Sequence, residues 1–133
     1  MKCIDECVDC FDNDLNKLDL DVDISKVTNL IVTVIFDFFV NSLVSQKLIL
    51  GYTINPPLNS KCIHKLGSTI EKTYERNVDI NDVFNKAGVC RVIAQIILSV
   101  FSLNTKESGT LNDVGKIEAT RAASAYLESW IKK

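Results

Sequence analysis

Three cysteines near the N-terminus and one distant histidine are the residues whose types could form a metal site. Cys3, Cys7 and Cys10 recur at steps of four and three, so they would share one face of a helix. Structural zinc usually draws on two pairs of ligands, whereas His64 is the single histidine of the chain. The sequence therefore favours free thiols over a metal site, and no cofactor is expected.

Motifs for catalysis are also missing from the sequence. No Ser or Cys motif places a nucleophile beside His64, and neither a P-loop nor a G-x-G-x-x-G sequence occurs. An odd number of cysteines, five, without a signal peptide indicates a reducing compartment. We therefore expect a protein that acts by binding and not as an enzyme.

The net charge of −2 is distributed unevenly along the 133 residues. Residues 1–25 carry eight acidic side chains and two lysines, a balance of −6, and the remainder carries nine acids and thirteen bases, a balance of +4. The acidic segment is either solvated or in contact with the basic remainder. No basic stripe interleaved with aromatic residues occurs, so nucleic-acid binding is not expected.

Apolar spacing predicts an all-α fold in a single domain over residues 1–133. Residues 1–25 fit a short helix, although the alternation in Leu18–Asp23 also fits an extended segment. Ser25 can cap a long helix that ends near Leu50, because this apolar run exceeds the ordinary length of a strand. A charge at Asp37 interrupts the run, so we expect a core helix and no integral membrane segment.

Three further helical segments follow a loop that contains Pro56 and Pro57. The first begins near Ser60 and carries one apolar face, formed by Ile63, Leu66, Ile70 and Tyr74. Asp79 or Asn81 can cap a short helix with Val83 and Phe84, which Gly88 would separate from the next helix.

That next helix, Val89–Leu103, is apolar around most of its circumference and belongs at the centre of a bundle. A polar loop is expected over Asn104–Thr110. Asn112 or Asp113 can cap the last helix, which runs towards Trp130 with an apolar set of Ile117, Ala122, Ala125 and Leu127.

Four short segments occur in a set order between residues 30 and 131. They are Val34–Phe39 with Ser45–Lys47, Ile63–Ser68 with Ile70 and Tyr74, Asp82–Phe84 with Gly88–Ala94, and Leu127–Ile131. In this order they resemble the first helix and then the third, first and second homology motifs of the Bcl-2 family of apoptosis regulators. The chain departs from the family pattern where Gly88, Val89 and Cys90 stand in place of Asn-Trp-Gly. It resembles a short, tail-less viral homologue from a large DNA virus of the iridovirus kind.

The resemblance implies a Bcl-2-like helical bundle in which the central helix over residues 89–103 is wrapped by amphipathic helices. It also implies a pro-survival function, in which a hydrophobic groove sequesters the homology 3 helix of pro-apoptotic proteins. Arg91 would pair with the acidic residue of that helix, because a guanidinium meets a carboxylate with two parallel hydrogen bonds. The residues implied to form the groove are Ile70, Tyr74, Val78, Val83, Arg91, Ile93, Ala94 and Leu98.

A second use of the same fold stays open, because Cys90 adds a side chain where the family has glycine. The protein would then inhibit innate immune signalling through surface contacts, without binding a death-motif helix. A homodimer is a further expectation, since an uncovered apolar groove favours self-association. The expected location is the cytoplasm of the host cell, with peripheral attachment to mitochondria through partners. The groove hypothesis requires a cleft beside Arg91.

Overall fold

Four α-helices make up the part of the chain that the computed structural model describes, which is residues 24–42, 60–81 and 83–131. They are α2 (Ile24–Val40), α4 (Ser60–Asn77), α5 (Lys86–Ser108) and α6 (Asp113–Ile131), and no strand occurs in these ranges. The predicted all-α fold class is therefore confirmed. The predicted N-terminal helix, the cysteine site at Cys3, Cys7 and Cys10, and the loop before α4 lie outside the described residues.

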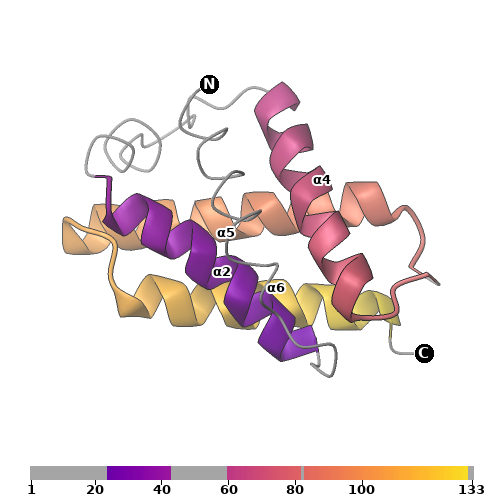
Figure 1. The fold of residues 1–133 in the computed structure, drawn as a ribbon. Helices are drawn as coiled ribbons and strands as arrows, with labels where there is room; N and C mark the ends of the chain where they lie inside the picture. The colour runs from indigo at the N-terminus through magenta and orange to yellow at the C-terminus, as the bar shows by residue number, and fades with distance from the viewer. Residues whose placement is uncertain (1–23, 43–59, 82, 132–133) are drawn as a thin grey trace.

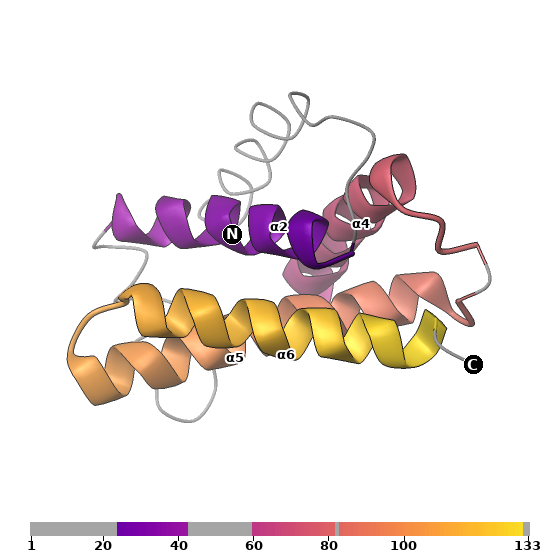
Figure 2. The same cartoon turned by 90° about the horizontal axis from the view of Figure 1, so that it is seen from below.

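The helices form two layers (Figures 1 and 2). Helices α5 and α6 run antiparallel side by side, joined by the short connection over residues 109–112. Helix α2 packs along α6, and α4 crosses α5 at a steep angle and contacts α2. Since α4 approaches the half of α5 that lies beside the end of α6, three helices meet at this end of the bundle.

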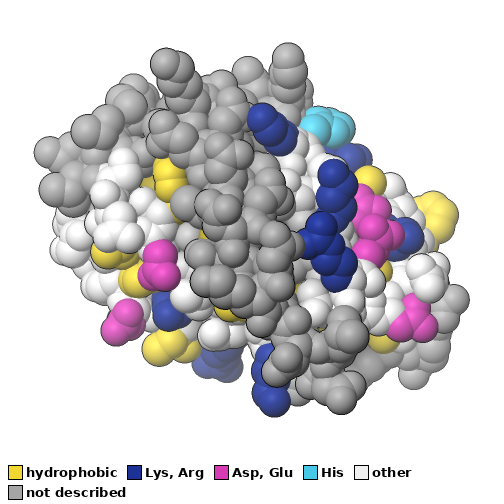
Figure 3. All heavy atoms as spheres, viewed as in Figure 1, with side chains coloured by type: hydrophobic (Ala, Val, Ile, Leu, Met, Phe, Trp, Pro, Cys, Tyr) yellow, Lys and Arg dark blue, Asp and Glu magenta, His cyan; other side chains and the backbone are white. Residues whose placement is uncertain are grey.

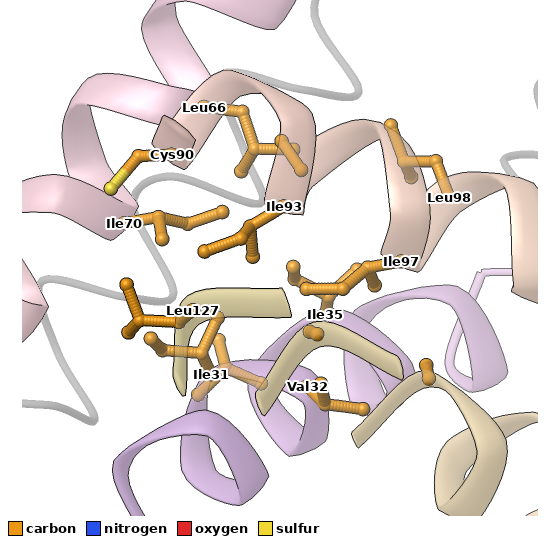
Figure 4. Packing of buried hydrophobic residues seen from close by; sticks show 14 of the residues in the cluster. Ile31, Val32, Ile35, Leu66, Ile70, Cys90, Ile93, Ile97, Leu98 and Leu127 are labelled. Atoms are coloured by element: carbon orange, nitrogen blue, oxygen red, sulfur yellow. The ribbon is translucent and has the colours of Figure 1, made fainter. Parts of the chain in front are cut away.

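The buried core takes side chains from all four helices (Figure 4). Its largest fully buried side chains are Tyr74, Phe39, Phe101, Ile31, Ile35, Leu66, Ile70 and Ile93. The predicted apolar face of α4 is confirmed at Leu66, Ile70 and Tyr74, whereas Ile63 is only partly buried. The Thr28 and Tyr74 hydroxyls form a hydrogen bond inside this core, so the polar ends of both side chains are satisfied.

Helix α5 buries one side and exposes a narrow apolar strip on the other. Val92 is 41% exposed, Leu103 is 57% exposed and Ile96 is only partly buried. The prediction of a helix covered around most of its circumference is therefore wrong for this strip. By length and composition α5 is the one helix within the described ranges that could cross a membrane, and half of its apolar window is buried in the fold, as in a core helix.

The ends of α5 differ from those predicted. Asn85, with a left-handed φ of 55°, precedes the first turn, and its side chain accepts a hydrogen bond from the Gly88 N–H. Gly88 therefore lies inside α5 and does not separate two helices. The helix continues to Ser108 and ends at Gly109, whose φ of 79° suits a residue without a Cβ.

Asn104 explains why the predicted polar loop is helical as far as Ser108. Its amide donates to the Asn112 Oδ1 at 3.0 Å, and its Oδ1 accepts from the Asn112 N–H at 2.8 Å. The Asn112 Oδ1 also accepts from the Val114 N–H at 3.0 Å, so the predicted Asn112 cap of α6 is confirmed. Asn104 and Asn112, eight positions apart in the chain, thus connect α5 to the start of α6. Asn104 is buried although it is polar.

Three other predictions of local structure need correction. Helix α2 begins at Ile24, so Ser25 lies within it, and it ends at Val40, ten residues before the predicted end near Leu50. The Asn41 and Ser42 N–H groups donate to the carbonyls of Asp37 and Phe39 in its last turn. The segment after Asn77 is a turn, in which Asp79 accepts a hydrogen bond from the Asn81 N–H. On α6 the buried residues are Gly115, Ala119, Ala123, Ser124 and Leu127, whereas Ile117, Ala122 and Ala125 are exposed.

Candidate partner-binding pocket

A close crossing of α4 and α5 fixes the backbone at Arg91. A Cβ added to Gly67 would lie 2.7 Å from Arg91 Cγ, 3.1 Å from Arg91 Cα and 3.2 Å from the Arg91 backbone N. Only glycine allows this approach without a shift of one helix. Gly67 belongs to the Ile63–Ser68 segment, and Arg91 belongs to the Gly88–Ala94 segment. The close approach of the two residues therefore brings together two of the segments on which the resemblance depends.

A surface pocket of about 640 Å³ lies beside Arg91. The start of α4, the turn before α5, the first half of α5 and the end of α6 all contribute to it. The residues that line it are Ile63, His64, Phe84, Asn85, Gly88, Val89, Arg91, Val92, Gln95, Tyr126 and Trp130. This volume falls in the range of pockets that hold a small ligand or a few side chains of a partner.

Arg91 is the one charged side chain among the described residues that line the pocket. Arg91 and His64 line it, and no Asp or Glu occurs among the described lining residues. Arg91 forms no ion pair with any residue in the described ranges. The nearby Lys86 differs, because its Nζ lies 2.9 Å from the Glu75 carboxylate and this hydrogen bond raises the pKa of Lys86. Of these two cations, Arg91 is therefore the one better placed to bind an anionic group of another molecule.

The remaining wall of the pocket is mainly apolar and aromatic. Phe84 is 77% exposed and Trp130 is 39% exposed, while Tyr126 and Ile63 are partly buried. Such exposed aromatic side chains around a concave surface are typical of contact sites for other molecules. The pocket therefore offers an apolar surface next to the Arg91 guanidinium.

A second charged surface lies over α4, where Lys and Arg side chains gather beside Asp and Glu (Figure 3). Lys65, Lys72 and Arg76 are exposed on this helix, next to Glu71 and Glu75. Lys65 and Arg76 already interact with other groups of the protein itself. This mixture of signs is characteristic of a solvated helix face.

Of the residues predicted to form the groove, only Arg91 lines the pocket. The others lie in the core beneath it: Ile70, Tyr74, Val83, Ile93, Ala94 and Leu98 are buried, and Val78 is partly buried against the core. The physical reason is the periodicity of the helices, since the apolar faces of α4 and α5 pack against each other and leave their flanks for the pocket.

Most residues that line the pocket lie on these flanks and were not predicted to form the groove. Phe84 follows Val83 and Val92 follows Arg91, so their place beside assigned residues is the signal that the sequence offered. Their exposure is known only from the structure. His64 and Tyr126 carry no such signal in the sequence. Trp130, near the end of α6, lines the pocket and is 39% exposed.

Cys90 does not line the pocket, although it stands where the resemblance led us to expect crowding. Its side chain is 1% exposed and forms part of the core. Burial raises the pKa of the Cys90 thiol to about 12, and the carboxylates of Glu71 and Glu75 add to this effect. Within the described ranges, no group of His, Cys, Asp and Glu is arranged to hold a metal ion.

Comparisons with known protein families, with curated proteins and with solved structures find no match to the chain.

Proposed function

We propose that the protein is a pro-survival, Bcl-2-like inhibitor of apoptosis that sequesters the homology 3 helix of pro-apoptotic proteins. The observation that carries the proposal is the pocket beside Arg91, because Arg91 is the residue that the resemblance assigns to the acidic side chain of the partner helix. The ordered motifs and the all-α bundle support the same function. A viral origin, action in the host cytoplasm and attachment to mitochondria through partners are parts of this proposal.

The pocket would bind one side of an amphipathic helix. A large apolar side chain of the partner would occupy the aromatic surface near Phe84 and Trp130, and an acidic side chain would accept hydrogen bonds from the Arg91 guanidinium. The protein would act by occupancy, because a partner helix held in this way is withheld from its own targets. No chemical step is involved.

A panel of death-motif peptides, titrated against the full chain, tests this function. Micromolar or tighter binding that Arg91→Ala weakens by about tenfold or more is the expected result, since a charge-assisted hydrogen-bonded pair is lost. Arg121→Ala is the matched control, because the Arg121 side chain is 77% exposed and its guanidinium lies 3.8 Å from the exposed carboxylate of Glu118. If no peptide binds, or if both variants weaken binding equally, the proposal is wrong.

A second candidate keeps the fold and uses surface contacts to inhibit innate immune signalling. The burial of six predicted groove residues favours it, because the groove as first mapped is filled by the protein's own side chains. Inhibition in a signalling reporter assay that survives Arg91→Ala, together with no peptide binding, is the result that supports this use.

Self-association is a related proposal that the exposed side chains support. Phe84, Leu103, Val114 and Ile117 are each more than half exposed, and such apolar surface favours contact between copies. Light scattering across a range of concentrations tests this, and a constant monomer mass at the highest concentration contradicts it.

A further inference from the structure

We propose that the Arg91 pocket also binds a free amphipathic carboxylate, that is, a small molecule with one carboxylate on an apolar chain. This goes beyond the proposed function, because it assigns a small-molecule ligand to a site that the resemblance reserves for a helix. The helix-binding function and the carboxylate site use the same pocket, but neither proposal requires the other.

The charge of the pocket determines the sign of the ligand. Arg91 lines it without a carboxylate among the described lining residues, and Arg91 has no ion-pair partner in the described ranges. A planar guanidinium with free N–H groups binds a carboxylate through two parallel hydrogen bonds. An ammonium ligand would be repelled, and an uncharged ligand would gain only the apolar contact.

The apolar wall determines the rest of the ligand. Ile63, Val92 and Trp130 supply aliphatic and aromatic surface to a concavity of about 640 Å³, which exceeds the size of a single partner side chain. The pocket lies against one end of the α5–α6 hairpin and is not a groove along the whole bundle. A compact ligand can therefore contact the wall and the cation together, whereas most of a long helix would lie beyond the pocket.

Trp130 provides a spectroscopic signal for ligand binding, because it is the only tryptophan in the chain and it lines the pocket. Sodium octanoate is titrated into the full-length protein while the Trp130 emission and its indole N–H signal are followed by fluorescence and NMR. Octanamide and octylamine serve as probes with the same chain and a neutral or positive head. We expect octanoate to bind about tenfold more tightly than octanamide, as one charge-assisted pair implies.

Substitutions at Arg91 and Val92 test the charge of the pocket, and a substitution at Arg121 is the matched control. Arg91→Gln should remove the preference for octanoate over octanamide, whereas Arg121→Gln, at an exposed site away from the pocket, should retain it. Val92→Glu should abolish octanoate binding, because it adds a carboxylate to the lining. Circular dichroism confirms that each variant is folded.

Three results would overturn the inference: equal affinity for octanoate and octanamide, no response of Trp130 to octanoate, or an equal loss in the two arginine variants. Death-motif peptides titrated into the same samples distinguish this failure from that of the proposed function. Peptide binding without octanoate binding contradicts only the carboxylate site. Octanoate binding without peptide binding contradicts only the helix-binding function.

Discussion

The Cα of Gly67 lies so close to Arg91 that an added Cβ would be 2.7 Å from Arg91 Cγ and 3.1 Å from Arg91 Cα. The residue that lets α4 and α5 cross at this distance thus contacts the residue that supplies the positive charge of the pocket. The packing of the two helices and the position of the pocket cation are therefore coupled, because a change in the crossing would move the Arg91 backbone.

Gly67→Ala should destabilise the fold despite the better helix propensity of alanine. Overpacking against backbone atoms costs about 1–3 kcal/mol, and alanine returns about 1 kcal/mol within a helix. We expect a net fall of about 1 kcal/mol in the free energy of unfolding, measured by urea denaturation. Ser68→Ala, at the exposed neighbouring position, is the control. If the two variants are equally stable, the crossing tolerates a Cβ.

Tyr74→Phe should reveal the strength of the buried contact between α2 and α4. Removing the hydroxyl leaves the Thr28 Oγ1 without its partner inside the core, which costs about 1–3 kcal/mol. The double variant Thr28→Val with Tyr74→Phe should lose less than the sum of the single changes, as measured by thermal and urea denaturation. Additive losses would mean that this hydrogen bond contributes nothing.

Asn104→Ala should weaken the α5–α6 hairpin. It removes the donor to Asn112 Oδ1 and the acceptor for the Asn112 N–H, so the free energy of unfolding should fall by about 2 kcal/mol. Glu107→Ala, at an exposed position of the same helix, should change it by less than about 0.5 kcal/mol. Equal effects of the two variants would contradict the role of Asn104 in closing the hairpin.

The buried Cys90 thiol predicts a loss of stability at alkaline pH. In the unfolded chain the thiol ionises near its ordinary pKa of 9.0, whereas burial raises the pKa to about 12 in the folded protein. Above pH 9 the folded state holds a proton that the unfolded state has released, so stability falls by up to about 1.4 kcal/mol per pH unit until pH 12.

Cys90→Ala is the variant that isolates this contribution. The alanine variant should be less stable at pH 8, because it leaves a small cavity, but the difference from the parent protein should narrow at pH 10.5. Urea denaturation at the two pH values measures it. Parallel behaviour of the two proteins would show that the thiol does not titrate differently on folding.

Val92→Glu should abolish peptide binding without harming the fold. Val92 lines the pocket and is 41% exposed, so a carboxylate there remains solvated and competes for Arg91. Val83→Glu should instead lower the melting temperature, because Val83 is 6% exposed and an unpaired carboxylate is costly in a core. Retained peptide binding by a folded Val92→Glu protein would place the partner elsewhere.

Local patterns were sufficient for those parts of the fold that depend on short-range physics. The start of α4 at Ser60, its buried face at Ile70 and Tyr74, and the Asn112 cap of α6 follow from helical periodicity and capping chemistry. The position of Arg91 beside a cleft was also expected, although from the resemblance and not from periodicity.

The sequence alone thus determined the all-α class, the main helical segments and the cation of the candidate site. Tertiary structure decided the environment of Asn104, which lies within α5 and is bonded to Asn112 at the start of α6. It also decided the pocket wall, which needs His64 of α4 and Trp130 of α6, two residues that lie more than sixty positions apart in the chain. Periodicity tells which side chains are apolar, but the packing of helix against helix determines which of them are buried and which remain accessible to a partner.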